Sequence, residues 1–298
     1  MRSGAMRLIL GLIWLLHWLP LPLLGRIGEA FGELLFLLMH QRRKITLTNL
    51  SLCLPALSAT ERHAMARAHF RAYARSVLER GILWWGSPER LRRLIEVEPF
   101  VPTQSSIEQP TIFLCPHFVC LEVAGVAITM QGPLCSIYTQ QRSKVFDQAL
   151  REGRSRFATK EDADRFLLWR GGGIKPIIRA MRSGRPFLML PDMDFGARES
   201  IFVPFFGVPA ATLTAPARLA AATQGQVIPV TTQFRPNYQG WRVRFHDAWE
   251  DFPGQDVETA TRRMNAFIED QIHLAPAEYF WSHKRFKTRP EGAPSVYD

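Results

Sequence analysis

Residues 111–122 read TIFLCPHFVCLE, which combines an apolar run, a proline and the start of a second apolar run. The first five residues are apolar apart from Thr111 and predict a short buried strand. Pro116 ends that strand, and the apolar run at 121–130 predicts a helix behind it. A strand that passes through a short loop into a helix is the unit from which α/β folds are built.

The same alternation continues along the chain. Further strands are predicted at 134–138, 186–190, 227–234 and 241–245, and helices at 60–85, 88–95, 174–182 and 213–223. Ser58 followed by Glu61 is the pattern of a capping box, which marks the start of the helix at 60–85. Strands that alternate with helices predict an α/β fold with a largely parallel central sheet flanked by helices.

Composition narrows the class of protein. The chain has 298 residues, of which 47% are hydrophobic and 21% charged, and this balance is typical of a globular protein. Its 37 Lys and Arg exceed its 27 Asp and Glu by 10, which favours an anionic partner: nucleic acid, an acidic lipid surface, a phosphorylated substrate or an acidic carrier protein. Four cysteines are too few for a small disulfide-stapled secreted fold.

The N-terminus carries a second signal. Residues 8–24 read LILGLIWLLHWLPLPLL, with basic residues on both sides. A bilayer span needs about 20 apolar residues, so this run is short. We expect residues 1–44 to form a membrane anchor that spans the bilayer or lies in its interface, and residues 45–298 to form the catalytic domain. A buried core helix and a cleaved signal peptide are the alternatives.

The loop after the first strand offers an acid–base pair, His117 and Glu122. On one continuous helix a five-residue step turns by about 140°, so the two side chains would point apart. They meet only if His117 lies in the loop and Glu122 in the first turn of the helix. Glu122 would then accept the Nδ1 proton and leave Nε2 free as a general base. A chance spacing, or a metal site formed with Cys115 and Cys120, is the alternative.

Several segments resemble the lipid A biosynthesis late acyltransferases, the lauroyl and myristoyl enzymes within the wider H-x4-D/E lysophospholipid acyltransferase superfamily. These segments are 43–55 (RKITLTNLSLCLP), 117–122 (HFVCLE), 153–156 (GRSR), 191–196 (PDMDFG), 203–207 (VPFFG) and 275–292 (APAEYFWSHKRFKTRPEG). They follow the order of the family and together span nearly the whole chain.

The resemblance implies a membrane-associated O-acyltransferase that needs neither a metal nor a cofactor. Its donor would be an acyl thioester of acyl carrier protein or coenzyme A, and its acceptor a hydroxyacyl chain of a lipid A precursor. His117 would be the general base, oriented by Glu122. The expected location is the cell inner membrane, on an anionic lipid surface, with the catalytic domain on the cytoplasmic side. A lysophospholipid or another glycolipid is the alternative acceptor, and a catalytically silent membrane scaffold is the alternative from another class.

The resemblance also implies roles for residues beyond the His/Glu pair. It assigns Arg154 to a phosphate or an oxyanion, with a solvated basic face as the alternative. Asp192 and Asp194 follow a buried strand at its carboxyl end, where α/β folds place their sites. We expect these two carboxylates to orient arginines or to close the active-site loop, and a simple turn cap is the alternative.

Two further segments are candidates for substrate contact. Lys284 and Arg285 lie in a basic cluster at 283–289, which we expect to contact a phosphate, a sugar acid or an anionic headgroup; a solvated tail is the alternative. No nucleic-acid recognition motif accompanies this cluster, so nucleic acid is not an expected partner. The aromatic stretch 202–206 would wall an acyl channel or belong to the core.

Overall fold

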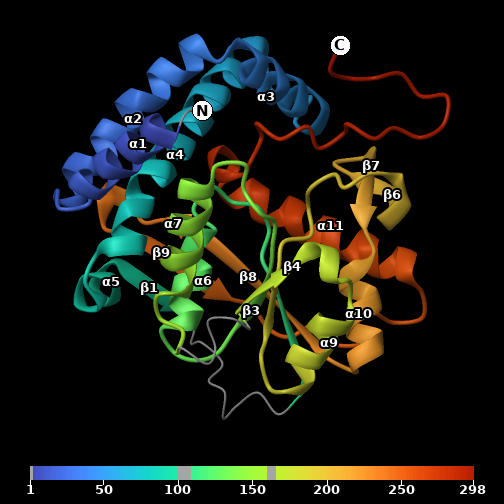
Figure 1. The fold of residues 1–298 in the computed structure, drawn as a ribbon. Helices are drawn as coiled ribbons and strands as arrows, with labels where there is room; N and C mark the ends of the chain where they lie inside the picture. Colours follow the sequence, from blue (N-terminus) through green and yellow to red (C-terminus); the bar gives the residue numbers. More distant parts are fainter. Residues whose placement is uncertain (1–2, 99–108, 160–165) are drawn as a thin grey trace.

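The computed structural model describes residues 3–98, 109–159 and 166–298, and its centre is a β-sheet (Figure 1). Within these residues seven strands form this sheet. In spatial order they are β1 (Ile95–Glu98), β9 (Trp241–Phe245), β8 (Gln226–Phe234), β2 (Thr111–Leu114), β5 (Phe187–Met189), β3 (Cys135–Tyr138) and β4 (Leu167–Trp169). All neighbouring pairs are parallel except β8 and β9. The predicted α/β fold with a largely parallel sheet is confirmed.

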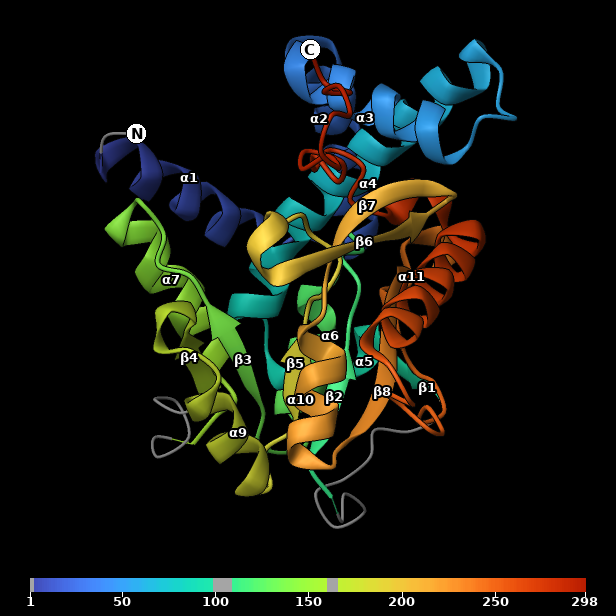
Figure 2. The same cartoon turned by 90° about the vertical axis from the view of Figure 1, so that its right-hand side faces the viewer.

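Helices cover both faces of the sheet (Figures 1 and 2). One face carries α5 (Pro88–Leu94), α6 (Glu122–Thr129) and α7 (Lys144–Ser155), and the other carries α9 (Lys175–Arg182), α10 (Ala215–Thr223) and α11 (Val257–Leu274). Strand β2 shows why both faces need a helical cover, because its apolar side chains alternate between the two faces and enter two cores. Phe113 belongs to the cluster around α6, whereas Ile112 and Leu114 belong to the cluster around α9–α11.

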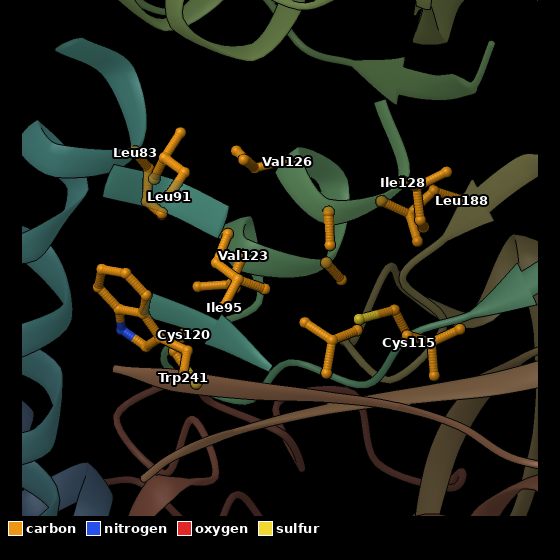
Figure 3. Packing of buried hydrophobic residues seen from close by; sticks show 14 of the residues in the cluster. Leu83, Leu91, Ile95, Cys115, Cys120, Val123, Val126, Ile128, Leu188 and Trp241 are labelled. Carbon is orange, nitrogen blue, oxygen red and sulfur yellow. The ribbon is translucent and has the colours of Figure 1, made fainter. Parts of the chain in front are cut away.

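Figure 3 shows the core on the α6 side of the sheet. Val123 and Val126 of α6 pack there with Leu188 of β5 and Trp241 of β9. The side chains of Cys115 and Cys120 lie in the same apolar cluster (Figure 3). Burial fixes the position of α6, and therefore the position of the loop that leads into it.

A helical layer stands above this sheet. It comprises α1 (Ser3–Leu16), α2 (Leu21–Leu38), α3 (His40–Cys53) and α4 (Ala59–Trp85). The predicted capping box is present, since Glu61 N donates to Ser58 Oγ at 3.2 Å and Ser58 N donates to Glu61 Oε2 at 2.7 Å. Gly28 lets helix α2 lie very close to α4. A Cβ at this position would be only 2.7 Å from Arg75 Cα.

Within the described residues, no helix combines the length and the apolar character needed to cross a bilayer. The expected domain boundary at residue 44 falls inside α3. Helices α1 and α2 nevertheless leave many large apolar side chains exposed. These are Leu8, Ile9, Leu12, Trp14, Leu15 and Trp18 of the first helix and its end, and Leu23, Phe31, Leu34, Leu37, Leu38 and Met39 of the second helix and its end.

A hairpin and a C-terminal segment complete the fold. Strands β6 (Ser200–Phe205) and β7 (Val208–Leu213) pair antiparallel in a separate two-stranded sheet of the described chain. After α11 the chain passes through the short 3-10 helix η5 (Pro276–Glu278) and returns across the top of the central sheet. This returning segment contacts the loop that follows β2.

Candidate active site

The site forms where two neighbouring strands end. His117 is the third residue after β2, and Asp192 is the third residue after β5. These strands are parallel neighbours, so their carboxyl ends lie at the same edge of the sheet. Cys115 N donates to Met189 O at 2.8 Å and extends the pairing toward both side chains.

His117 is bound by Asp192. The imidazole Nδ1–H donates to Asp192 Oδ1 at 2.7 Å, and the His117 backbone N–H donates to Oδ2 at 3.0 Å. Burial alone would raise the pKa of the Asp192 carboxyl, but the His117 ring and backbone N–H outweigh it and hold this pKa below its usual value. The carboxylate therefore stays ionised, fixes the proton on Nδ1 and leaves Nε2 free to act as a base.

The predicted contact between His117 and Glu122 is wrong. Glu122 is the first residue of α6, as expected, but its carboxylate faces Arg154. Arg154 Nε donates to Glu122 Oε2 at 3.0 Å, and Arg154 Nη2 donates to Oε1. A bidentate pair occupies both carboxylate oxygens, and Asp192 already occupies the Nδ1 of the histidine.

The Glu122–Arg154 ion pair joins two helix ends. Glu122 begins α6 and Arg154 lies in the last turn of α7, and each charge is favourable to the helix dipole at its position. Burial would raise the pKa of the Glu122 carboxyl, but Arg154, helped by Arg80, lowers it to about 2. Glu122 is therefore a carboxylate at any physiological pH.

Two adjoining cavities contain His117 and the Glu122–Arg154 pair. The first, of about 260 Å³, contains His117 and is lined mainly by apolar side chains, including Met189, Leu190, Phe195 and Leu213; we call it the His117 cavity. The second, the Glu122 cavity, is lined by the Glu122–Arg154 pair and extends to Trp84. They share four lining residues, Ser136, Ile137, Leu188 and Leu190. Together they offer an apolar slot beside the His117 imidazole.

The C-terminal segment holds the loop of His117 in place. Phe280 N donates to His117 O at 3.0 Å, and Val119 N donates to Glu278 O at 2.8 Å. Asp194 fastens the same segment, because it accepts hydrogen bonds from Thr288 N at 2.6 Å and from Thr288 Oγ1 at 2.7 Å. Asp194 thus ties the loop after β5 to the C-terminal segment, and Gly196 N also donates to its Oδ1 at 2.9 Å, which is the turn cap named as the alternative.

Two buried polar residues that sequence reasoning missed clamp this segment from the helical layer. Asn49 of α3 donates to Trp281 O and to His283 O, both at 2.7 Å. His69 of α4 lies 3.2 Å from Ala277 O through its Nδ1. Neither residue has a local signal, because their partners are more than 200 positions away in the sequence.

The predicted role of Arg285 in substrate binding is corrected. Only 3% of its surface is exposed. Its guanidinium donates to Ala211 O and Thr212 Oγ1, both at 2.7 Å, and ties the C-terminal segment to the β6–β7 hairpin. Lys284 is half-buried with its amine 5.4 Å from the ring centroid of Tyr297, and its contact with an anionic substrate stays a prediction.

The aromatic stretch 202–206 and the two cysteines near His117 are the remaining candidates from the sequence. Phe205, from the aromatic stretch, is fully buried in the core, whereas Phe202 is exposed. Burial raises the pKa of the Cys115 and Cys120 thiols well above the usual value, which disfavours the thiolates that a metal needs. Over the described ranges, no cluster of three or more His, Cys, Asp or Glu side chains is arranged to hold a metal ion.

Comparison with known proteins adds the chemistry. The family described as bacterial lipid A biosynthesis acyltransferase matches residues 2–288. The chain is 33% identical to the lipid A biosynthesis lauroyltransferase of Escherichia coli K12, over 97% of this chain and 93% of that protein. It is 30% identical to the palmitoleoyltransferase of the same strain, over 97% and 92%, and 29% identical to its myristoyltransferase, over 93% and 83%. The chain therefore belongs to the bacterial lipid A biosynthesis acyltransferase family and is an enzyme that transfers acyl groups.

Proposed function

We propose that this enzyme transfers a fatty acyl chain from an acyl thioester to a hydroxyl group on a hydroxyacyl chain of a lipid A precursor. The observation that carries the proposal is the His117–Asp192 pair, which opens on an apolar cavity in a chain of this family. An imidazole with a free Nε2 is the group that activates a hydroxyl, and the cavity offers an apolar environment for an acyl chain, at about 0.8 kcal/mol per buried methylene.

The reaction needs one base that later acts as an acid. His117 Nε2 removes the proton of the acceptor hydroxyl while the hydroxyl oxygen attacks the carbonyl carbon of the thioester. The tetrahedral intermediate collapses, the C–S bond breaks, and the imidazolium returns the proton to the leaving thiolate. Asp192 stabilises the imidazolium between these steps, as the carboxylate does in a catalytic triad, and the substrate hydroxyl takes the place of a protein nucleophile.

Acyl transfer is tested with purified enzyme, acyl carrier protein loaded with a fatty acid, and a lipid A precursor, with mass spectrometry of the lipid product. The proposal predicts a product heavier by one acyl group. A lysophospholipid offered in competition separates the alternative acceptor, since preferential acylation of that lipid would assign the enzyme to the other branch of the superfamily. An unchanged lipid A precursor with every thioester donor would reject this acceptor.

We further propose that α1 and α2 lie on the inner membrane, with the active site on its cytoplasmic side. Their exposed apolar side chains are typical of a helix that lies in the bilayer interface. Leu8, Leu12 and Leu15 follow helical spacing on α1 and are 77%, 54% and 60% exposed. Exposed Arg7 and Arg26 flank this surface and suit anionic headgroups. The acceptor lipid would then diffuse to the site within the membrane.

The double substitution Leu12→Glu/Leu15→Glu is expected to lower binding to vesicles of phosphatidylethanolamine and phosphatidylglycerol by at least about 100-fold. Each buried leucine contributes roughly 1.5–3 kcal/mol to insertion, and a charge opposes it further. Vesicle sedimentation measures the effect. Leu274→Glu is the control, because Leu274 at the end of α11 is 67% exposed but lies outside the two helices. Equal vesicle binding by the double variant and the wild type would contradict the proposal that α1 binds the membrane interface.

A further inference from the structure

A basic surface lies beside the His117 cavity. Helix α9 presents Lys175, Arg179 and Arg182, whose spacing of four and three residues places them on one face. All three are exposed, whereas Ile177 and Met181 of the same helix are buried. The helix has no acidic residue, so its outer face carries only positive charge.

The positive charge continues onto two neighbouring elements. Helix α10 packs beside α9 (Figure 2) and carries exposed Arg218, again without an acidic residue. The 3-10 helix η3 (Ala197–Glu199) adds exposed Arg198. Across the described ranges, no carboxylate forms an ion pair with any of these five side chains. We call Lys175, Arg179, Arg182, Arg198 and Arg218 the basic face.

The basic face is adjacent in the chain to residues that line the His117 cavity. Arg170, which lines the His117 cavity, belongs to the 3-10 helix η2 (Arg170–Gly172) just before α9. Glu199 and Ala215 also line this cavity, and they are neighbours of the basic face on η3 and α10. A molecule that docks on the basic face is therefore next to the cavity that holds the base.

The basic face also lies away from the proposed membrane surface. In Figure 2 the helices α1 and α2 stand at the top of the molecule, whereas α9 and α10 lie at the lower front. Charges on a surface that touches solvent rather than lipid suit a soluble macromolecule. The two substrates would then reach the site from different sides, the acceptor from the membrane and the donor from the solvent.

We propose that the basic face is the docking surface for an acidic carrier protein that delivers the acyl thioester on a flexible arm. The proposal rests on the proposed function, since it concerns the donor of the same reaction. A surface of unpaired positive charges matches an acidic protein surface and accelerates its encounter. The flexible arm then spans from the docked protein into the His117 cavity, while the bulk of the carrier stays on α9 and α10.

The test compares two donors that carry the same acyl chain, acyl carrier protein and acyl-pantetheine. Lys175→Glu/Arg179→Glu/Arg182→Glu is expected to raise KM for the carrier protein by about tenfold or more, because three rim charges change from attractive to repulsive. Its kcat/KM with acyl-pantetheine, which has no protein surface, should stay within about twofold of the wild type. The wild-type KM for the carrier should also rise with salt, and that of the variant should rise less.

Arg92→Glu/Arg93→Glu is the matched control, since both arginines are exposed on α5, on the opposite face of the sheet. This variant should keep the wild-type KM for both donors, and circular dichroism checks that all variants are folded. An unchanged KM for the carrier protein in the triple variant, or an equal loss with both donors, would overturn the docking surface. Transfer by the wild type from acyl-pantetheine but never from the carrier would overturn it too. Failure of the wild type with every donor would instead reject the proposed function.

Discussion

Replacing His117 with alanine is expected to lower kcat for acyl transfer by about 10³-fold, because general acid–base catalysis contributes between about 10² and 10⁴. The variant keeps the cavity walls and the Glu122–Arg154 pair, so substrate binding should change far less than turnover. Mass spectrometry of the acylated lipid, in single-turnover conditions, measures the rate.

His63→Ala is the matched control for this loss. His63 is exposed on α4, where its Nδ1 lies 2.9 Å from Ala59 O, and it takes no part in the site. The control should retain the wild-type rate. If His117→Ala kept more than a few per cent of the turnover while His63→Ala kept the wild-type rate, another group would have to remove the hydroxyl proton.

Breaking the Glu122–Arg154 pair has the second largest expected effect, and it falls on stability. Glu122→Gln or Arg154→Met should each lower the free energy of unfolding by roughly 3 kcal/mol, because each leaves an uncompensated charge in a mostly buried place. The double variant should lose less than the sum of the two, because both charges are then gone. Urea unfolding of the four proteins measures this coupling.

The pH dependence of stability gives the same pair a second readout. The pKa of Glu122 is lowered from 4.5 to about 2 in the folded protein. The folded state therefore gains stability from this group above pH 4.5 and loses it as the pH falls toward 2. Glu258→Gln is the control, because its pair with Arg262 is exposed on α11 and contributes about 0.5 kcal/mol or less. In the urea experiment, a double variant whose loss of unfolding free energy equals the sum of the two single losses would contradict the coupling.

Local patterns predicted most of the central fold. Strand β9 lies at 241–245 as expected, and the strands expected around 111–115, 134–138, 186–190 and 227–234 form within one or two residues of their predicted ends. Each of these is a short apolar run with turn residues beside it. The capping box likewise predicts the start of α4. Such signals are local, so one sequence is sufficient to find them.

Other elements carry no such signal. Strand β1 (IEVE) is half acidic and follows a helix directly, and the hairpin β6–β7 contains Pro204 and Pro209, which disfavour strands. Helix α11 carries polar residues at many positions. Tertiary packing decides all three: β1 pairs with β9 at the edge of the sheet, and α11 covers the hairpin.

The site shows the same division between local and distant information. Sequence reasoning found His117, Glu122, Arg154 and Asp192 but joined the first two, because they are five residues apart. Asp192 lies 75 positions from His117, and only the order of the strands brings them together. A sequence shows that both residues follow apolar strands; it does not show that β2 and β5 are neighbours. The side chain that pairs with His117 is therefore determined by sheet topology.

The most direct test of the account is a cycle of turnover rates for the wild type, His117→Ala, Asp192→Asn and the double variant. Asp192 acts only through His117 in the proposed mechanism, so its replacement should cost about 10²-fold or more alone and almost nothing once His117 is gone. We predict that the double variant lies within about threefold of His117→Ala. A double variant that shows the product of the two separate losses would contradict a histidine–aspartate pair acting as one catalytic unit.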